Sequence, residues 1–285
     1  MKLSFSTLGC PGWDLNKVLE CAVKYGYDGV DLRGLSGVMR TEDIPELQPS
    51  AINSTREAFA KSGKTLTCIG TSCSFHDPAK YHGAIEEGKN ALGICAKLGV
   101  PFIRVFGNNI KSEDGRAESD AVIAGIRELC AYADSLTEEY LMNADDAVKT
   151  EYNRIYVLLE VHGDFNTSRV LLPICRALEG ECFGIIWDFA HSERAGEDYR
   201  EFWRELKPYI LHTHVKDHKR EQNGGRKLCS VGDGDIPIIP TAELMLGDGY
   251  NGYFTLEHEL AWHPELAPAE EELPRYTDYM KRIGK

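Results

Sequence analysis

The feature that most constrains the fold of this chain is a regular alternation of short apolar runs with amphipathic stretches. Eight apolar runs are expected to form strands, at residues 3–7, 28–32, 65–70, 101–106, 155–160, 182–188, 209–215 and 252–257. Eight stretches with apolar residues at helical spacing follow them in turn, at 15–25, 51–62, 81–98, 117–136, 169–178, 198–206, 241–246 and 269–283. Strict alternation implies a parallel sheet, and eight strands is the number that closes a barrel. We therefore predict an α/β fold, a (β/α)8 TIM barrel, with residues 1–285 in a single domain.

Four of the later strand runs end in a side chain that can bind a divalent cation: Glu160, Asp188, His214 and Glu257. Each of these alone is more often a solvated strand end or a salt-bridge partner. In a closed parallel barrel, however, the carboxyl ends of all strands converge on one face, so the four side chains are expected to meet. Two glutamates, an aspartate and a histidine form an oxygen-rich set that suits Mn²⁺, Mg²⁺ or Co²⁺ and accepts Zn²⁺. We predict one divalent metal, with Mn²⁺ preferred.

Neighbouring polar residues on these strands extend the predicted site. Because side chains alternate along a strand, His212 and His214 share one face, as do Glu160 and His162. Each pair can therefore supply an inner group and a more distal one.

Two features of the chain leave a structural alternative. An open, doubly wound parallel sheet competes with the barrel, but such a sheet collects its site at one switch point rather than from four successive strands. The polar segment 137–154 precedes the fifth strand run, away from the predicted site. It is either an extended or broken helix or an interaction element.

Composition excludes several classes of function. The formal net charge of -13 disfavours nucleic acid, whose binding relies on Lys and Arg. No apolar run approaches the roughly 20 residues that span a bilayer, and residues 1–7 are too short an apolar run for a secretion signal. The cysteines, nine in number, include no C-x-x-C pair and lie mostly within strand or helix patterns. We therefore expect a cytoplasmic protein with reduced, partly buried thiols and neither a nucleic-acid partner nor a membrane partner.

Several motifs, in this order and spacing, resemble those of one family. They are 28–33 (DGVDLR), 158–163 (LLEVHG), 187–191 (WDFAH), 212–217 (HTHVKD), 232–235 (GDGD), 249–253 (GYNGY) and 256–259 (LEHE). The chain resembles the xylose isomerase-like TIM barrel family over essentially its whole length. Within that family it is similar to the sugar phosphate isomerase and epimerase branch, which includes ketose 3-epimerases.

The resemblance implies roles for individual residues. Glu160, Asp188, His214 and Glu257 would ligate one cation, and the two glutamates would also be the catalytic bases. His191 and Lys216 match positions near the substrate. Arg104 would either contact the substrate or form a salt bridge to a ligand carboxylate, and His162 would either bind substrate or orient Glu160.

The chemistry that follows is proton transfer next to a carbonyl. A cation chelated by a keto sugar or related polyol stabilises the enediolate that forms when the neighbouring C–H is deprotonated. Return of the proton to the opposite face gives an epimerase, and transfer to the adjacent carbon gives an isomerase. Loss of a hydroxyl or an aglycone instead gives a lyase, such as an inosose or dehydroshikimate dehydratase or an enzyme that cleaves a 3-oxo C-glycoside. A non-enzymatic metal-binding module is a further alternative.

Departures from the family narrow the substrate class. Endonucleases of the endonuclease IV type share this barrel but need a histidine at strand four, where this chain reads RVFG at 104–107. The loop 231–235 (VGDGD) is acidic, so a neutral sugar or glycoside is favoured over a sugar phosphate; its glycines form either a plain turn or a binding loop. Family members are commonly oligomers, so a homo-oligomer is expected.

Overall fold

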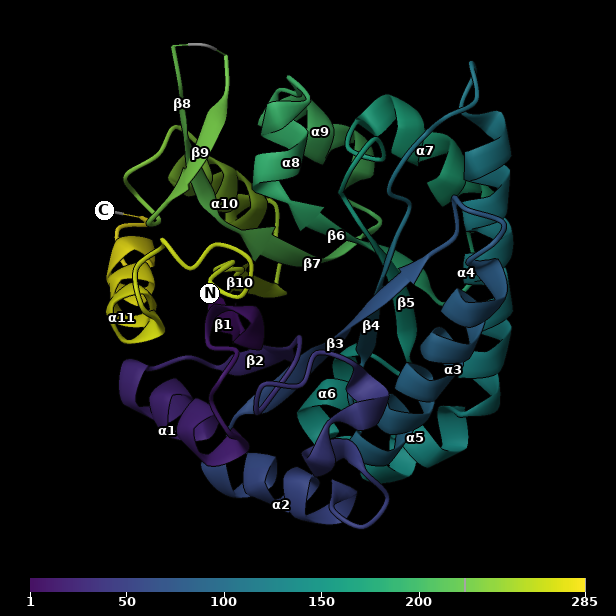
Figure 1. Ribbon diagram of the computed structural model, residues 1–285, viewed down its shortest axis with the longest axis vertical. Coiled ribbons are helices and arrows are strands. Elements are labelled where there is room, and N and C mark those ends of the chain that lie inside the picture. The colour runs from purple at the N-terminus through teal and green to yellow at the C-terminus, as the bar shows by residue number, and fades with distance from the viewer. Residues whose placement is uncertain (223, 285) are drawn as a thin grey trace.

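A closed barrel of eight parallel strands forms the centre of the computed structural model, which describes residues 1–222 and 224–284 (Figure 1). The strands are β1 (Lys2–Ser6), β2 (Gly29–Leu32), β3 (Thr65–Ser74), β4 (Phe102–Phe106), β5 (Tyr156–Glu160), β6 (Phe183–Asp188), β7 (Ile210–Val215) and β10 (Tyr253–Leu256). Parallel pairing of β1 with both β2 and β10 closes the barrel. The predicted single-domain (β/α)8 barrel is confirmed, and the open sheet is excluded.

Eight helices alternate with these strands and surround the barrel (Figure 1). They are α1 (Leu15–Tyr25), α2 (Ile52–Ser62), α3 (Tyr81–Leu98), α4 (Arg116–Ser135), α7 (Ser168–Ala177), α9 (Tyr199–Leu206), α10 (Ile238–Gly247) and α11 (Ala269–Met280). Local chemistry sets their ends. The Asp14 side chain accepts from the Lys17 N–H at the start of α1, and Gly26 ends that helix in the left-handed conformation at φ 75°.

Several short elements interrupt the regular alternation of strands and helices. The segment 137–154 contains two short helices, α5 (Thr137–Asn143) and α6 (Asp146–Glu151), which is the broken helix that the sequence left as one alternative. The first barrel crossovers also contain three 3₁₀ turns, η1 (Thr7–Gly9), η2 (Thr41–Asp43) and η3 (Pro45–Leu47). At the carboxyl end of the barrel, β6 leads directly into α8 (Phe189–Arg194). There, β7 leads into an antiparallel hairpin of β8 (Asp217–Arg220) and β9 (Arg226–Cys229).

An apolar floor closes the barrel interior below the predicted site. Phe102, Leu158 and Ile186 are buried together inside the barrel with Cys68. The Phe102 ring lies 5.7 Å from the ring of His212, measured between centroids. Polar side chains above this floor are therefore held in a low-dielectric setting, where charge interactions are strong.

The cysteines lie mostly in the packed interior. All nine cysteines are free thiols, and every one except the half-buried Cys229 is buried. Among the described residues, no helix combines the length and apolar character that a membrane span requires.

Candidate metal centre and substrate cavity

The four predicted metal ligands meet at the carboxyl end of the barrel. Their strands β5, β6, β7 and β10 are consecutive in the barrel order, and the Asp188 backbone pairs with His214. One donor atom from each of Glu160, Asp188, His214 and Glu257 lies within 4.8 Å of the other three, and all four side chains are buried. The structure thus brings together the set that strand ends alone suggested.

Unsatisfied oxygens in this cluster indicate that it suits a cation. Among the described residues, neither Glu160 Oε2 nor Asp188 Oδ2 has a hydrogen-bond partner of good geometry, although both atoms are buried. His214 Nδ1 lies 2.9 Å from Glu160 Oε1 and 3.2 Å from Glu257 Oε1, so its ring nitrogen points into the carboxylate set. Each of the two oxygens lies beside a basic side chain, Arg104 or Lys216, without an aligned hydrogen bond. Three carboxylates buried this close together repel one another, and a divalent cation would balance their charge.

Two buried cations balance the carboxylates. Arg104 Nη1 lies 3.2 Å from Glu160 Oε2 and 3.4 Å from Glu257 Oε1. Lys216 Nζ lies 2.9 Å from Asp188 Oδ2, 2.8 Å from Glu257 Oε2 and 2.6 Å from Glu259 Oε1. The salt bridge that the sequence left as one alternative for Arg104 is present, and it involves both glutamates.

Burial and charge act against each other on the titrating groups. Burial favours the neutral acid at Glu257, yet Lys216 and His214 hold its pKa well below the usual value. Burial and Glu257 likewise oppose ionisation of Glu160, but Arg104 and His214 lower its pKa to about 2. At Asp188 burial dominates over Lys216 and raises the pKa. The two glutamates are therefore held ionised, as a base requires.

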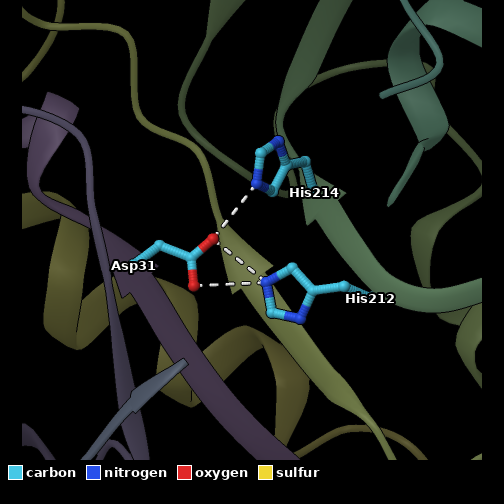
Figure 2. Close-up of side chains that lie close together, drawn as sticks. All are labelled: Asp31, His212 and His214. Atoms are coloured by element: carbon cyan, nitrogen blue, oxygen red, sulfur yellow. Dashed lines mark hydrogen bonds and ion pairs between the residues drawn. The ribbon is translucent and has the colours of Figure 1, made fainter. Parts of the chain in front are cut away.

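A second polar group, which the sequence did not reveal, adjoins the ligand His214 (Figure 2). Asp31 on β2 faces His212 and His214 across the barrel: His212 Nε2 is 3.0 Å and His214 Nε2 3.2 Å from Asp31 Oδ2. The Thr67 hydroxyl also donates to Asp31. Burial opposes ionisation of Asp31, but the two histidines hold its pKa below the usual value. In the sequence, the signal for this contact is an acidic residue, Asp31, between two apolar strand residues, Val30 and Leu32.

The other predicted substrate residues lie at the mouth of the barrel. The His162 and His191 rings are 4.4 Å apart between centroids, and His162 Nδ1 lies 3.1 Å from Asn108 Oδ1. Burial, with help from Lys216, lowers the pKa of His191 to about 3, so its imidazole is neutral. Within the described residues, the polar contact of His162 is with Asn108 in the loop after β4 rather than with Glu160.

A cavity of about 310 Å³ adjoins this mouth. Its walls come from the end of β7, α8, the β8–β9 hairpin and the loop after β10; the lining residues are Ala190, His191, Arg194, Lys216, His218, Arg226, Lys227, Leu228, Glu259, His263 and Glu265. Nine of these eleven residues have polar or charged side chains. Such a cavity suits a small, hydroxyl-rich molecule whose one end reaches the ligand set.

Glu193 on α8 fixes the hairpin that forms one wall. Its Oε2 lies 2.9 Å from His218 Nε2 and 3.3 Å from Arg226 Nε, and its Oε1 accepts from Arg220. Three contacts from one carboxylate tie both hairpin strands to α8. The position of this cavity wall therefore depends on Glu193, which is not among the residues that line the cavity.

The glycine-rich loop 231–235 is a structural turn. The Gly232 and Gly234 N–H groups donate to Asp217 Oδ2 at 2.9 and 3.0 Å, and the Ile236 N–H donates to Oδ1 at 3.2 Å. A Cβ on Gly234 would lie 2.0 Å from Asp217 Oδ1, so this position requires glycine. The backbone donors that a phosphate would need are engaged by Asp217.

Comparison with known proteins agrees with the fold. Residues 19–282 match the family model described as xylose isomerase-like TIM barrel. The chain is 29% identical over 121 residues to the uncharacterized protein YihM of Escherichia coli (strain K12), an alignment of 40% of this chain and 37% of that protein. Among the solved structures that are similar along 99% of both chains, two illustrate the range of reactions. One is the probable 3-DHS dehydratase AsbF of Bacillus anthracis, with a TM-score of 0.72 and 17% identity. The other is D-psicose 3-epimerase with D-tagatose from Clostridium cellulolyticum H10, with a TM-score of 0.71 and 18% identity.

Proposed function

This chain belongs to the xylose isomerase-like TIM barrel family, and from that membership and the geometry of its site we propose that it is a divalent-metal-dependent isomerase or epimerase of a keto sugar or related polyol. One observation carries the proposal. Three buried carboxylates and His214 converge beside two buried cations at the open end of the barrel, next to a polar cavity.

The proposed metal ligands are Glu160, Asp188, His214 and Glu257. Their oxygen-rich donor set favours Mn²⁺, with Mg²⁺, Co²⁺ or Zn²⁺ as alternatives. When bound, the cation supplies a Lewis acid that polarises the substrate carbonyl and makes the neighbouring C–H more acidic. The protein must then supply a base and a second group that returns the proton.

Glu160 and Glu257 are proposed to move the proton. Their strands β5 and β10 lie at the two ends of the four-strand run that carries the ligands, so the glutamates approach from different sides. Both pKa values are lowered, so both carboxylates are ionised, as a proton acceptor must be. Removal by one glutamate and return by the other would invert the carbon, as epimerisation requires.

The proposed substrate contacts lie around the same mouth. His191 is neutral and can both donate to and accept from a hydroxyl, and Lys216 lines the cavity beside it. Arg104 and His162 complete the set, with Arg104 holding both glutamates ionised through its two ion pairs. The substrate is expected to be an uncharged sugar or glycoside, because Asp217 already engages the glycine-loop amides.

A lyase of the same fold is the second candidate. Elimination begins with the same proton abstraction, and the similarity to a probable dehydratase over 99% of the chain keeps this reaction in view. The two classes differ in which leaving group the cavity aligns, rather than in the ligand set.

The test is NMR of the metal-loaded protein in D₂O with ketoses, inososes and 3-oxo-glycosides. Deuterium at a carbon beside the carbonyl, together with a new stereoisomer or aldose, would support the proposal and identify the carbon. Loss of water or aglycone would move the assignment to a lyase. A metal-loaded protein that exchanges no proton in any of these compounds would contradict both candidates.

A further inference from the structure

We infer that Asp31 and His212 form a buried positioning layer that holds His214 in the ring orientation and tautomer needed to bind the metal. This inference rests on the ligand set proposed above. Neither residue faces the cavity: Asp31 is on β2, on the far side of the barrel from the ligand strands, and His212 lies two residues deeper in β7 than His214 (Figure 2).

Both ring nitrogens of His214 face carboxylates, but only one of them faces the ligand set. Its Nε2 lies 3.2 Å from Asp31 Oδ2, and its Nδ1 faces Glu160 and Glu257 at 2.9 and 3.2 Å. A carboxylate has only acceptors, so the nitrogen facing Asp31 must carry a proton. Without a metal, Nδ1 carries a proton for the same reason, because it faces Glu160 and Glu257. A cation held by the two glutamates would take the place of that Nδ1 proton, while the Nε2 proton stays on the contact with Asp31, so Nδ1 would be the nitrogen that offers a lone pair.

His212 has a matching geometry that serves Asp31. Its Nε2 lies 3.0 and 3.2 Å from the two Asp31 oxygens, so this nitrogen also carries a proton. Its Nδ1 is buried and lacks a hydrogen-bond partner within the described part of the chain. An apolar residue at position 212 would avoid the free-energy cost of burying this unpaired nitrogen. The contact that justifies a histidine here is therefore the one with Asp31.

Together these contacts fix Asp31 from three sides. His212, His214 and the Thr67 hydroxyl of β3 all donate to its carboxylate, which therefore cannot rotate without breaking a buried hydrogen bond. A carboxylate that orients a metal-binding histidine through its other ring nitrogen typically raises metal affinity. The layer thus connects β2 and β3, which supply no ligand, to the ligand on β7.

The same three side chains could instead hold a second cation, and the experiment must distinguish that site from a positioning layer. Asp31, His212 and His214 each present a donor atom within 4.8 Å of the others, the spacing of a second cation site. A second ion there would require His214 to bind through both nitrogens and so to lose both ring protons. The inference therefore predicts one ion per chain and a proton at Nε2.

The experiment is a calorimetric titration of chelator-stripped protein with Mn²⁺ and with Zn²⁺, with elemental analysis of the loaded samples. The wild-type chain should bind one ion, and Asp31→Asn should bind it about ten- to a hundredfold more weakly with unchanged stoichiometry. Glu118→Gln is the matched control, because Glu118 is also a buried carboxylate but hydrogen-bonds only to residues 111 and 112. Its metal affinity should equal that of the wild type.

A measurement on the wild-type chain makes the result independent of how Asp31→Asn folds. In the Zn²⁺-loaded protein with ¹⁵N-labelled histidine, NMR should show His214 protonated at Nε2 and metal-shifted at Nδ1. Two bound ions, an unprotonated Nε2, or an Asp31→Asn affinity equal to the wild type in a folded sample would each overturn the inference. Binding of one ion without any keto-sugar exchange would reject the proposed reaction and leave the positioning layer intact, whereas a wild type that binds no ion would reject both.

Discussion

The two halves of the barrel contribute differently to the site. Strands β5, β6, β7 and β10 supply the three carboxylates and the histidine that meet at the centre. Strands β2 and β4 supply Asp31 and Arg104, which contact those residues from outside this run of four strands: β2 lies across the barrel and β4 lies next to β5. The second half thus carries the groups that would do the chemistry, and the first half carries groups that set their charge and orientation. Substitutions in the two halves should therefore fail in different ways.

The largest effect is expected from Glu257→Gln in the second half. The amide keeps the shape of the side chain but cannot accept a proton, so turnover should fall by about 10²- to 10⁴-fold or more while the fold persists. The rate of substrate deuterium exchange and the circular dichroism spectrum measure the two quantities. Glu118→Gln is the control, because Glu118 is a buried carboxylate that belongs neither to the ligand cluster nor to the cavity lining. Full activity in Glu257→Gln would reject this residue as a base.

The matching change in the first half is Arg104→Met. It leaves Glu160 and Glu257 without their shared buried counter-charge, so the metal-free protein should lose about 3 kcal/mol of unfolding free energy. Urea unfolding with and without Mn²⁺ measures the loss. We expect the loss to be smaller with metal, because a bound cation takes over part of the charge balance. An equal loss in both conditions would show that Arg104 acts through packing rather than charge.

A smaller effect is expected at the cavity wall. Glu193→Gln removes the charge that ties His218, Arg220 and Arg226 to α8. The hairpin should then sit less rigidly, raising KM by roughly three- to tenfold at unchanged metal affinity, since charged hydrogen bonds of this kind contribute about 1 to 2 kcal/mol. Steady-state kinetics measures the change in KM, and metal titration measures the metal affinity. A change in metal affinity instead would mean that the wall and the ligand set are not independent.

The smallest effect is expected at Glu118, which lies outside the site and should make the stability of the protein depend on pH. The Ser112 hydroxyl and the amides of residues 111 and 112 donate to Glu118 and lower its pKa to about 2 from an ordinary 4.5. A lowered folded-state pKa means that this stabilisation is complete above about pH 4.5 and is lost as the pH falls towards 2. Wild type should therefore lose stability relative to Glu118→Gln over that range in urea unfolding. A constant difference between the two proteins would contradict the assignment.

Much of the fold and part of the site were predictable from local pattern. The eight strand runs and the helices that alternate with them were recognisable because barrel strands are apolar and helix ends are marked by residues such as Gly26 and Gly63. The β8–β9 hairpin was not, because its strands are polar and lack alternation. Antiparallel pairing of Lys219 with Lys227 has no sequence signature. The cavity wall that this hairpin forms could not be predicted for the same reason.

By itself the sequence determined the barrel and the four strand-end residues Glu160, Asp188, His214 and Glu257, because strand periodicity and residue type are local properties. Tertiary structure alone decided that Asp31 lies against His212 and His214, that Arg104 contacts two glutamates, and that Asp217 takes up the glycine-loop amides. These contacts join residues that are far apart in the chain. Their energies depend on the distances and burial that barrel closure imposes, which no local pattern records.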